Sequence, residues 1–90
     1  RVPGIPERLA EEAAAFVRGL RGLDLAKPPG VAETIDWAQA LAALGRSDID
    51  EQVVEATLGA VLKYREDQDR VRQHGVATLV RHALERGAAG

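Results

Sequence analysis

Ninety residues of ordinary composition suffice for one small domain and leave little room for a deep, enclosed active site. The chain is 46% hydrophobic and 29% charged, which excludes a disordered class, and its formal net charge of −2 argues against nucleic acid as a partner. It contains no cysteine, which excludes disulfides and thiolate metal sites and is consistent with a cytoplasmic location.

The first helix is expected over about residues 6–22. Pro6 suits the first turn of a helix, because the N–H that proline lacks has no partner there. Acidic residues, Glu12 among them, come early and arginines come late, an order that complements the helix dipole. Apolar residues recur at spacings of three and four, namely Leu9, Ala13, Phe16, Val17 and Leu20.

A turn and a second helix follow. Pro28 and Pro29 cannot continue a helix, so the segment 22–30 is expected to turn. Residues 31–44 then carry an apolar stripe, and Gly45 suits the left-handed position that often follows a helix. We therefore predict a second helix over about residues 31–44.

The third helix is expected to begin after Asp48 or Asp50, since either side chain can cap the apolar stripe that follows. Beyond that stripe the run 63–72 is almost wholly polar and predicts either a break or a solvated helix. Within this run Asp67 is spaced to pair with Lys63 on a helix surface.

A last amphipathic stripe over residues 76–84 predicts the fourth helix, and residues 86–90 are expected to fray. No segment alternates as a strand would. The predicted fold is therefore all-α, a small four-helix bundle that forms one domain over residues 1–90.

Motifs that carry catalysis are absent from the sequence. It contains no phosphate loop, no dinucleotide-binding glycine turn, no zinc-binding HExxH and no serine elbow. His74 and His82 lie eight apart in the predicted last helix rather than at the i, i+4 spacing that binds zinc. No apolar run approaches the roughly 18–20 residues that cross a bilayer. We expect no catalytic residue, no metal site and no membrane span.

Three residues are candidates for contact with another domain or chain. Trp37, the single tryptophan, is rotated roughly 200° around the helix from Ile35, so it is either a core residue or an interface anchor. Tyr64 and Arg65 lie in the polar run 63–72, which is either a solvated surface or an interface.

The start of the second helix is sharply defined. Gly30 falls at the N-cap, and Glu33 at the third helical position can reach back to the N–H of the cap residue. Lys27 lies just upstream. This helix start is either simply capped or a binding site for an anion such as a phosphate.

The segments "LDLAKPPGVAETIDWAQALAALG" and "VVEATLGAVLKYREDQ", separated by an acidic cap, resemble the C-terminal helical lid subdomain of MoxR-family AAA+ ATPases, particularly the CoxD-like branch. The resemblance spans about residues 1–73, and "RVPGIPERLAEE" fits the junction with the large subdomain. It implies that residues 1–90 form an AAA+ lid of all-α fold.

This resemblance implies a lid that covers the nucleotide and couples ATP hydrolysis to subunit motion and to remodelling of client proteins or maturation of metalloenzymes. The partners it implies are the missing large AAA+ subdomain, a homo-oligomeric ring, usually a hexamer, and a protein with a von Willebrand factor A domain. ATP and Mg²⁺ would be cofactors of the full-length protein, with none bound by this chain alone. The phosphate loop belongs to the large subdomain, so this chain alone is expected to be inactive.

Related lids aim a sensor 2 arginine at the nucleotide phosphates, from a position that aligns at about Ala32 here. This sequence departs from that pattern. Lys27 is the nearest cation that could take the role, with the helix start around Gly30 assisting.

Two alternatives belong to other classes. A free-standing helical protein–protein interaction module would use Trp37 and the polar run, whereas a helix-turn-helix DNA binder is opposed by Glu51 and Glu55 on its recognition helix. The chain opens on Arg1 and contains no methionine, so we expect a piece of a longer protein. A phosphate loop encoded in frame upstream would favour the ATPase, and a start codon near Arg1 would favour the module.

Overall fold

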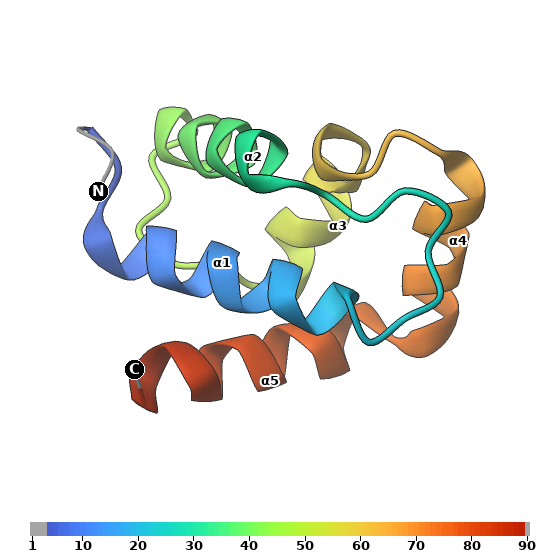
Figure 1. The fold of residues 1–90 in the computed structure, drawn as a ribbon. Helices are drawn as coiled ribbons and strands as arrows, with labels where there is room; N and C mark the ends of the chain where they lie inside the picture. Colours follow the sequence, from blue (N-terminus) through green and yellow to red (C-terminus); the bar gives the residue numbers. More distant parts are fainter. Residues whose placement is uncertain (1–3, 90) are drawn as a thin grey trace.

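A computed structural model describes the backbone of residues 4–89 and the side chains of residues 4–86. Within these residues the chain forms five α-helices and no β-strand (Figure 1). The helices are α1 (Glu7–Leu20), α2 (Val31–Ala43), α3 (Glu51–Val61), α4 (Arg65–His74) and α5 (Val76–Ala89). The all-α prediction is confirmed, whereas the predicted number of helices, four, has to be corrected to five.

The additional helix, α4, arises from the polar run that predicted either a break or a solvated helix. It is not fully solvated, because Asp67 and Val71 are buried. Gly75 ends it with φ +113°, a backbone conformation that residues with a Cβ rarely adopt, and α5 begins at the next residue. α5 continues to Ala89 through most of the tail that was expected to fray, and Gly90 lies outside the described residues.

Local hydrogen bonds explain where the other helices begin and end. Gly45 has φ +80°, as predicted, and the N–H groups of Gly45 and Arg46 donate to the carbonyls of Ala42 and Leu41, closing α2 in a Schellman motif. Of the two candidate caps for α3, Asp50 occupies the N-cap, and its carboxylate accepts from the Val53 N–H at 2.8 Å.

The helices are arranged around α1. α1 packs against α5 along one side and against α2 on the other, and α3 contacts both α2 and α5 (Figure 1). α4 lies at the end of the molecule where the connection from α1 to α2 passes (Figure 1). The radius of gyration, 11.8 Å, is close to the value of about 12 Å expected for a compact domain of this length.

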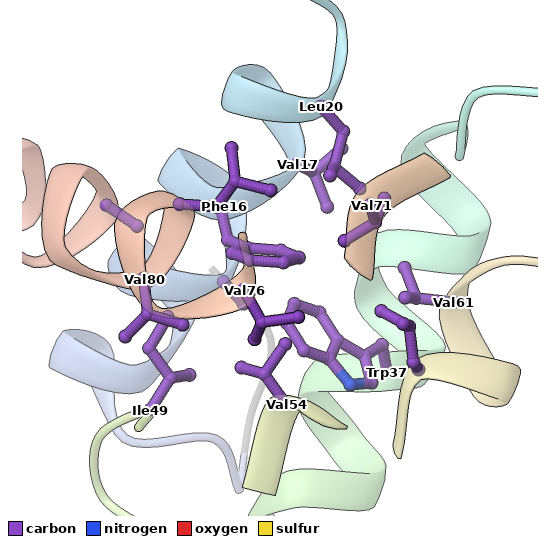
Figure 2. Packing of buried hydrophobic residues seen from close by; sticks show 14 of the residues in the cluster. Phe16, Val17, Leu20, Trp37, Ile49, Val54, Val61, Val71, Val76 and Val80 are labelled. Atoms are coloured by element: carbon purple, nitrogen blue, oxygen red, sulfur yellow. The ribbon is translucent and has the colours of Figure 1, made fainter. Parts of the chain in front are cut away.

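Trp37 lies at the centre of the core and is only 1% exposed (Figure 2). Its ring lies 5.4 Å from that of Phe16, centroid to centroid, and its Nε1–H donates to Oγ1 of Thr57 at 2.8 Å. The Thr57 hydroxyl in turn donates to the Val53 carbonyl at 2.7 Å. Other fully buried large apolar side chains include Leu9, Leu20, Leu41, Val54, Leu58, Val61, Leu62 and Val71.

This placement decides between the two alternatives for Trp37. As an interface candidate it has to be corrected, because α1 and α3 both pack against α2 and enclose the indole. The apolar residues on the other side of α2 differ in environment: Ile35 is partly buried and Val31 is 73% exposed. Trp37 therefore joins three helices of the core rather than offering a contact surface.

Replacing Trp37 by alanine should lower the free energy of unfolding by about 3–5 kcal/mol, since it leaves a large cavity and strips Thr57 of its donor. The measurement is denaturant unfolding followed by far-UV circular dichroism. Val31→Ala is the control on the same helix, and because Val31 is largely exposed its effect should stay within about 0.5 kcal/mol. Similar effects of the two substitutions would contradict this assignment of the core.

Candidate functional site

The loop that carries Lys27 is held by a buried carboxylate on α4. Asp67 is 1% exposed, and its Oδ1 and Oδ2 accept hydrogen bonds from the backbone N–H groups of Ala26 at 2.7 Å and Lys27 at 2.9 Å. Hydrogen bonds to a carboxylate are stronger than those between neutral groups. Because one carboxylate holds two consecutive N–H groups, the backbone at Lys27 is fixed while its side chain stays exposed.

This contact replaces the expected surface pair between Asp67 and Lys63. Asp67 turns inward to the α1–α2 loop, because that loop supplies two donors that the helix surface lacks. The next residue, Gln68, donates from Nε2 to the Leu62 carbonyl in the α3–α4 connection at 2.9 Å. We call Asp67 and Gln68 the loop clamp, since together they tie two connecting segments to the first turns of α4.

Gly30 occupies the N-cap of α2, as the sequence predicted. Its N–H donates to Oε1 of Glu33 at 2.9 Å, and the Thr34 hydroxyl donates to the Gly30 carbonyl at 2.7 Å. Hydrogen bonds from the backbone N–H groups of Glu33 itself and of Gly30 hold the pKa of the Glu33 carboxyl below its usual value, and Lys63 and Lys27 act in the same direction. The carboxylate of Glu33 therefore lies where an external anion would meet this helix.

Two lysines flank that carboxylate. The crease beside it has a volume of about 10 Å³, room for about one water molecule. The crease is lined by Lys27, Pro28, Pro29, Glu33, Val61 and Lys63. In this chain by itself, the start of α2 is a capped helix end with two cations beside it, and not an enclosed phosphate pocket.

A larger apolar groove of about 340 Å³ runs between α1 and α2. The charged residues that line it are Arg18 and Arg21, both exposed and near the end of α1. Val31 lines the groove from the first turn of α2 and is the most exposed of the large apolar residues described. The remaining lining residues are Ile5, Ala10, Ala14, Val17, Thr34, Ile35 and Ala38. This groove and the crease at Lys27 lie on adjoining faces of the first turn of α2.

The three interface candidates are not brought together on one surface. Tyr64 is the N-cap of α4 and is 46% exposed, and Arg65, the first residue of α4, is also exposed. Trp37 is enclosed in the core. Lys63, the residue before Tyr64, lines the crease at Lys27, whereas Tyr64 and Arg65 line neither that crease nor the apolar groove.

Glu12 is a buried charged residue that the sequence did not indicate. It is 2% exposed, and its Oε1 accepts from the Ile49 N–H at 2.8 Å while Oε2 accepts from Nε of Arg8 at 3.0 Å. An early acidic residue in a helix is explained equally well by the helix dipole, so its sequence position carries no sign of burial. Glu12 ties the segment before α3 to α1 and has no part in the groove.

Other kinds of site are not found among the described residues. No three or more His, Cys, Asp or Glu side chains are grouped so that they could hold a metal ion. In the same part of the chain, no helix is both long enough and apolar enough to cross a membrane.

Comparison of the chain with protein-family models, with curated proteins and with solved structures finds no match in any of the three.

Asp67→Asn should lower the free energy of unfolding by about 2–3 kcal/mol, because an amide can accept from only one side and leaves one loop N–H without a partner. Amide hydrogen exchange should accelerate at Ala26 and Lys27 more than in the centre of α3. Asp69→Asn is the matched control, since Asp69 is exposed and its contact with Arg72 is long, at 3.5 Å. Equal effects of the two substitutions would count against the loop clamp.

Glu33 should stabilise the fold in a pH-dependent way. Its pKa is lowered in the folded state from an ordinary value of 4.5, so its contribution is complete above that value and is lost as pH falls through the folded-state pKa. The stability difference between the natural chain and Glu33→Gln should therefore be largest near neutral pH and vanish in acid. Thermal unfolding at a series of pH values measures it. If Asp36→Asn, on the exposed surface of the same helix, gave the same trend, the cap would not be its cause.

Proposed function

We propose that this chain is the helical lid of a MoxR-family AAA+ ATPase of the CoxD-like branch. The observation that carries the proposal is the resemblance of two long sequence segments to such lids. In the structure the first segment covers the α1–α2 loop and α2, and the second covers most of α3 and the start of α4. These are the segments that the loop clamp joins, through Asp67 and the backbone of Ala26 and Lys27. A lid of this kind would pack on a nucleotide-binding core and cover the nucleotide from one side.

The apolar groove supports this proposal. A groove lined by apolar atoms and flanked by Arg18 and Arg21 is suited to a partner that buries it. In the proposed arrangement the large subdomain covers the groove and the exposed Val31, and the first turn of α2 then faces the nucleotide. The large subdomain would supply the phosphate loop, the acidic magnesium-binding motif and the arginine finger.

Lys27 is the residue proposed to approach the phosphates. Ala32 stands where the arginine of other branches aligns, so the cation would come from the loop rather than from the helix. Since Glu33 already caps the helix, a phosphate would be attracted by the ammonium groups of Lys27 and Lys63 more than by vacant N–H groups. ATP and Mg²⁺ would be bound by the core, and this chain alone would not hydrolyse ATP.

The loop clamp suggests how such a lid would move. Because the first turns of α4 hold both the loop before α2 and the α3–α4 connection through partly buried hydrogen bonds, these segments would shift as one body. We place this lid in a cytoplasmic ring of identical subunits, usually a hexamer. There the rigid motion would pass the nucleotide state to the next subunit and drive remodelling of client proteins or maturation of metalloenzymes. The partner in that work would be a protein with a von Willebrand factor A domain.

A free-standing helical interaction module is the second candidate. It is favoured by the completeness of the core, since every buried side-chain nitrogen and oxygen in the described residues has a hydrogen-bond partner. In that case the same groove would bind a partner protein and Lys27 would have no catalytic consequence. The coding sequence in frame upstream of residue 1 separates the two candidates, because only the ATPase requires a phosphate loop there.

In the full-length ATPase, Lys27→Ala should lower kcat/KM for ATP by about tenfold or more, because it removes a cation aimed at the phosphates. Lys27→Arg should keep most of the activity. Arg81→Ala, at an exposed position on α5 away from the crease, controls for loss of surface charge. Unchanged turnover and nucleotide affinity in Lys27→Ala would remove the role of Lys27, and an upstream gene without a phosphate loop would remove the lid proposal altogether.

A further inference from the structure

A second hollow, of about 270 Å³, lies where the end of α1, the end of α4 and α5 meet. The proposed lid function makes no use of it. Its floor and walls come from small and apolar residues, and its charged or titratable lining residues are two histidines and one arginine. The lining residues are Ala15, Gly19, Gly22, Leu23, His74, Leu79, His82, Ala83 and Arg86.

The histidine and arginine side chains of this hollow can all donate hydrogen bonds, and none has a partner in the part of the chain that the structure describes. Among the described residues that line the hollow, none carries a carboxylate. His74, His82 and Arg86 form no side-chain hydrogen bond or ion pair among the described residues, whereas Arg72 pairs with Glu55 and Asp69. Most basic side chains among the described residues are likewise unpaired, so the hollow is distinguished by the two histidines and one arginine that line it together.

Gly75 brings the two histidines to the same hollow. The sequence placed His74 and His82 on one helix, eight residues apart, where they would share only a loosely similar face. Instead α4 ends at His74 and Gly75 turns the chain with φ +113°, so that one histidine reaches the hollow from each helix. A Cβ at Gly75 would also lie 3.4 Å from Oγ1 of Thr78. The turn therefore requires glycine.

The floor of the hollow lets an occupant approach the backbone of α1 closely. Two of its positions, Gly19 and Gly22, have no side chain, and a Cβ added at Gly19 would meet only Cδ2 of Leu79, at 3.9 Å. The carbonyls of Gly19 and Leu20 already accept from the N–H groups of Gly22 and Leu23. No hydrogen bond joins these carbonyls to the imidazole or guanidinium groups among the described residues.

We infer that this hollow binds a small molecule that carries an oxyanion group, phosphate or carboxylate, on a short apolar body. A guanidinium binds either group through two parallel hydrogen bonds, and each imidazole adds a donor. A water molecule occupies about 30 Å³ of liquid volume, so the hollow exceeds the needs of a bare ion. The excess space is bounded by Leu23 and Leu79, which suit an apolar body.

The test is a titration of the 90-residue chain, followed by chemical shifts of backbone amides and histidine rings. Three probes separate the sources of the oxyanion: phenyl phosphate, benzoate and inorganic phosphate. Phenyl phosphate or benzoate should shift the amides of Gly19 and Gly22 together with His74 and His82, at least tenfold more tightly than inorganic phosphate. Equal affinity for inorganic phosphate, or shifts scattered over all basic residues, would overturn the inference.

Matched variants assign the binding to this hollow. Arg86→Gln and the double change His74→Asn with His82→Asn should each weaken the tighter probe at least tenfold, and Gly19→Ala should weaken it by raising the floor. Arg81→Gln is the control, because Arg81 lies on the same helix but lines a different hollow with Glu85. Its effect should stay within twofold. If Arg81→Gln weakened binding as much as Arg86→Gln, with circular dichroism unchanged in both, the site would not exist.

Discussion

The carboxylate of Asp67 is the contact on which the arrangement of this small domain most depends. It is buried, it comes from the most polar helix of the chain, and it binds two N–H groups that lie 41 and 40 residues earlier. A buried carboxylate is costly to desolvate and is tolerated only where donors meet it. The need to satisfy that charge therefore fixes the position of the α1–α2 loop, and the loop in turn fixes where α2 begins.

Glu12 is a second buried carboxylate that accepts a hydrogen bond from a distant loop. It ties the N–H of Ile49, which lies 37 residues later, to α1 and so fixes the segment that leads into α3. In a domain of this size the apolar core is small, and the loops add few apolar side chains to it. Hydrogen bonds from the loop backbone to charged groups supply part of the stability that apolar burial does not provide there. Both carboxylates act on loops, whereas the helix bodies are held by the apolar cluster around Trp37 and Phe16.

These constraints also shape the surface. The loop clamp holds the loop before α2, and Glu33 caps the first turn of α2 itself. The start of the helix therefore has Lys27 beside it on one face and presents Val31 on the next. A cation beside an uncovered apolar groove is compatible with the proposed lid, which rests on the resemblance of the two sequence segments. The hollow at His74, His82 and Arg86 lies away from this turn, between α1, α4 and α5.

The sequence by itself determined the helices that have strong apolar periodicity, the Gly30 cap and the left-handed Gly45, because each depends on residues within a few positions along the chain. It limited the cap of α3 to Asp48 or Asp50, and the structure placed Asp50 there. Only the tertiary structure decided that Asp67 and Glu12 are buried. Their hydrogen-bond donors lie in loops far along the chain, so the spacing of neighbouring residues does not indicate these contacts. The tertiary structure also decided that Trp37 is core, because both of the helices that cover it had to be placed first. Local spacing reports a helix and its caps, whereas burial and satisfied charges depend on which segments the whole chain brings together.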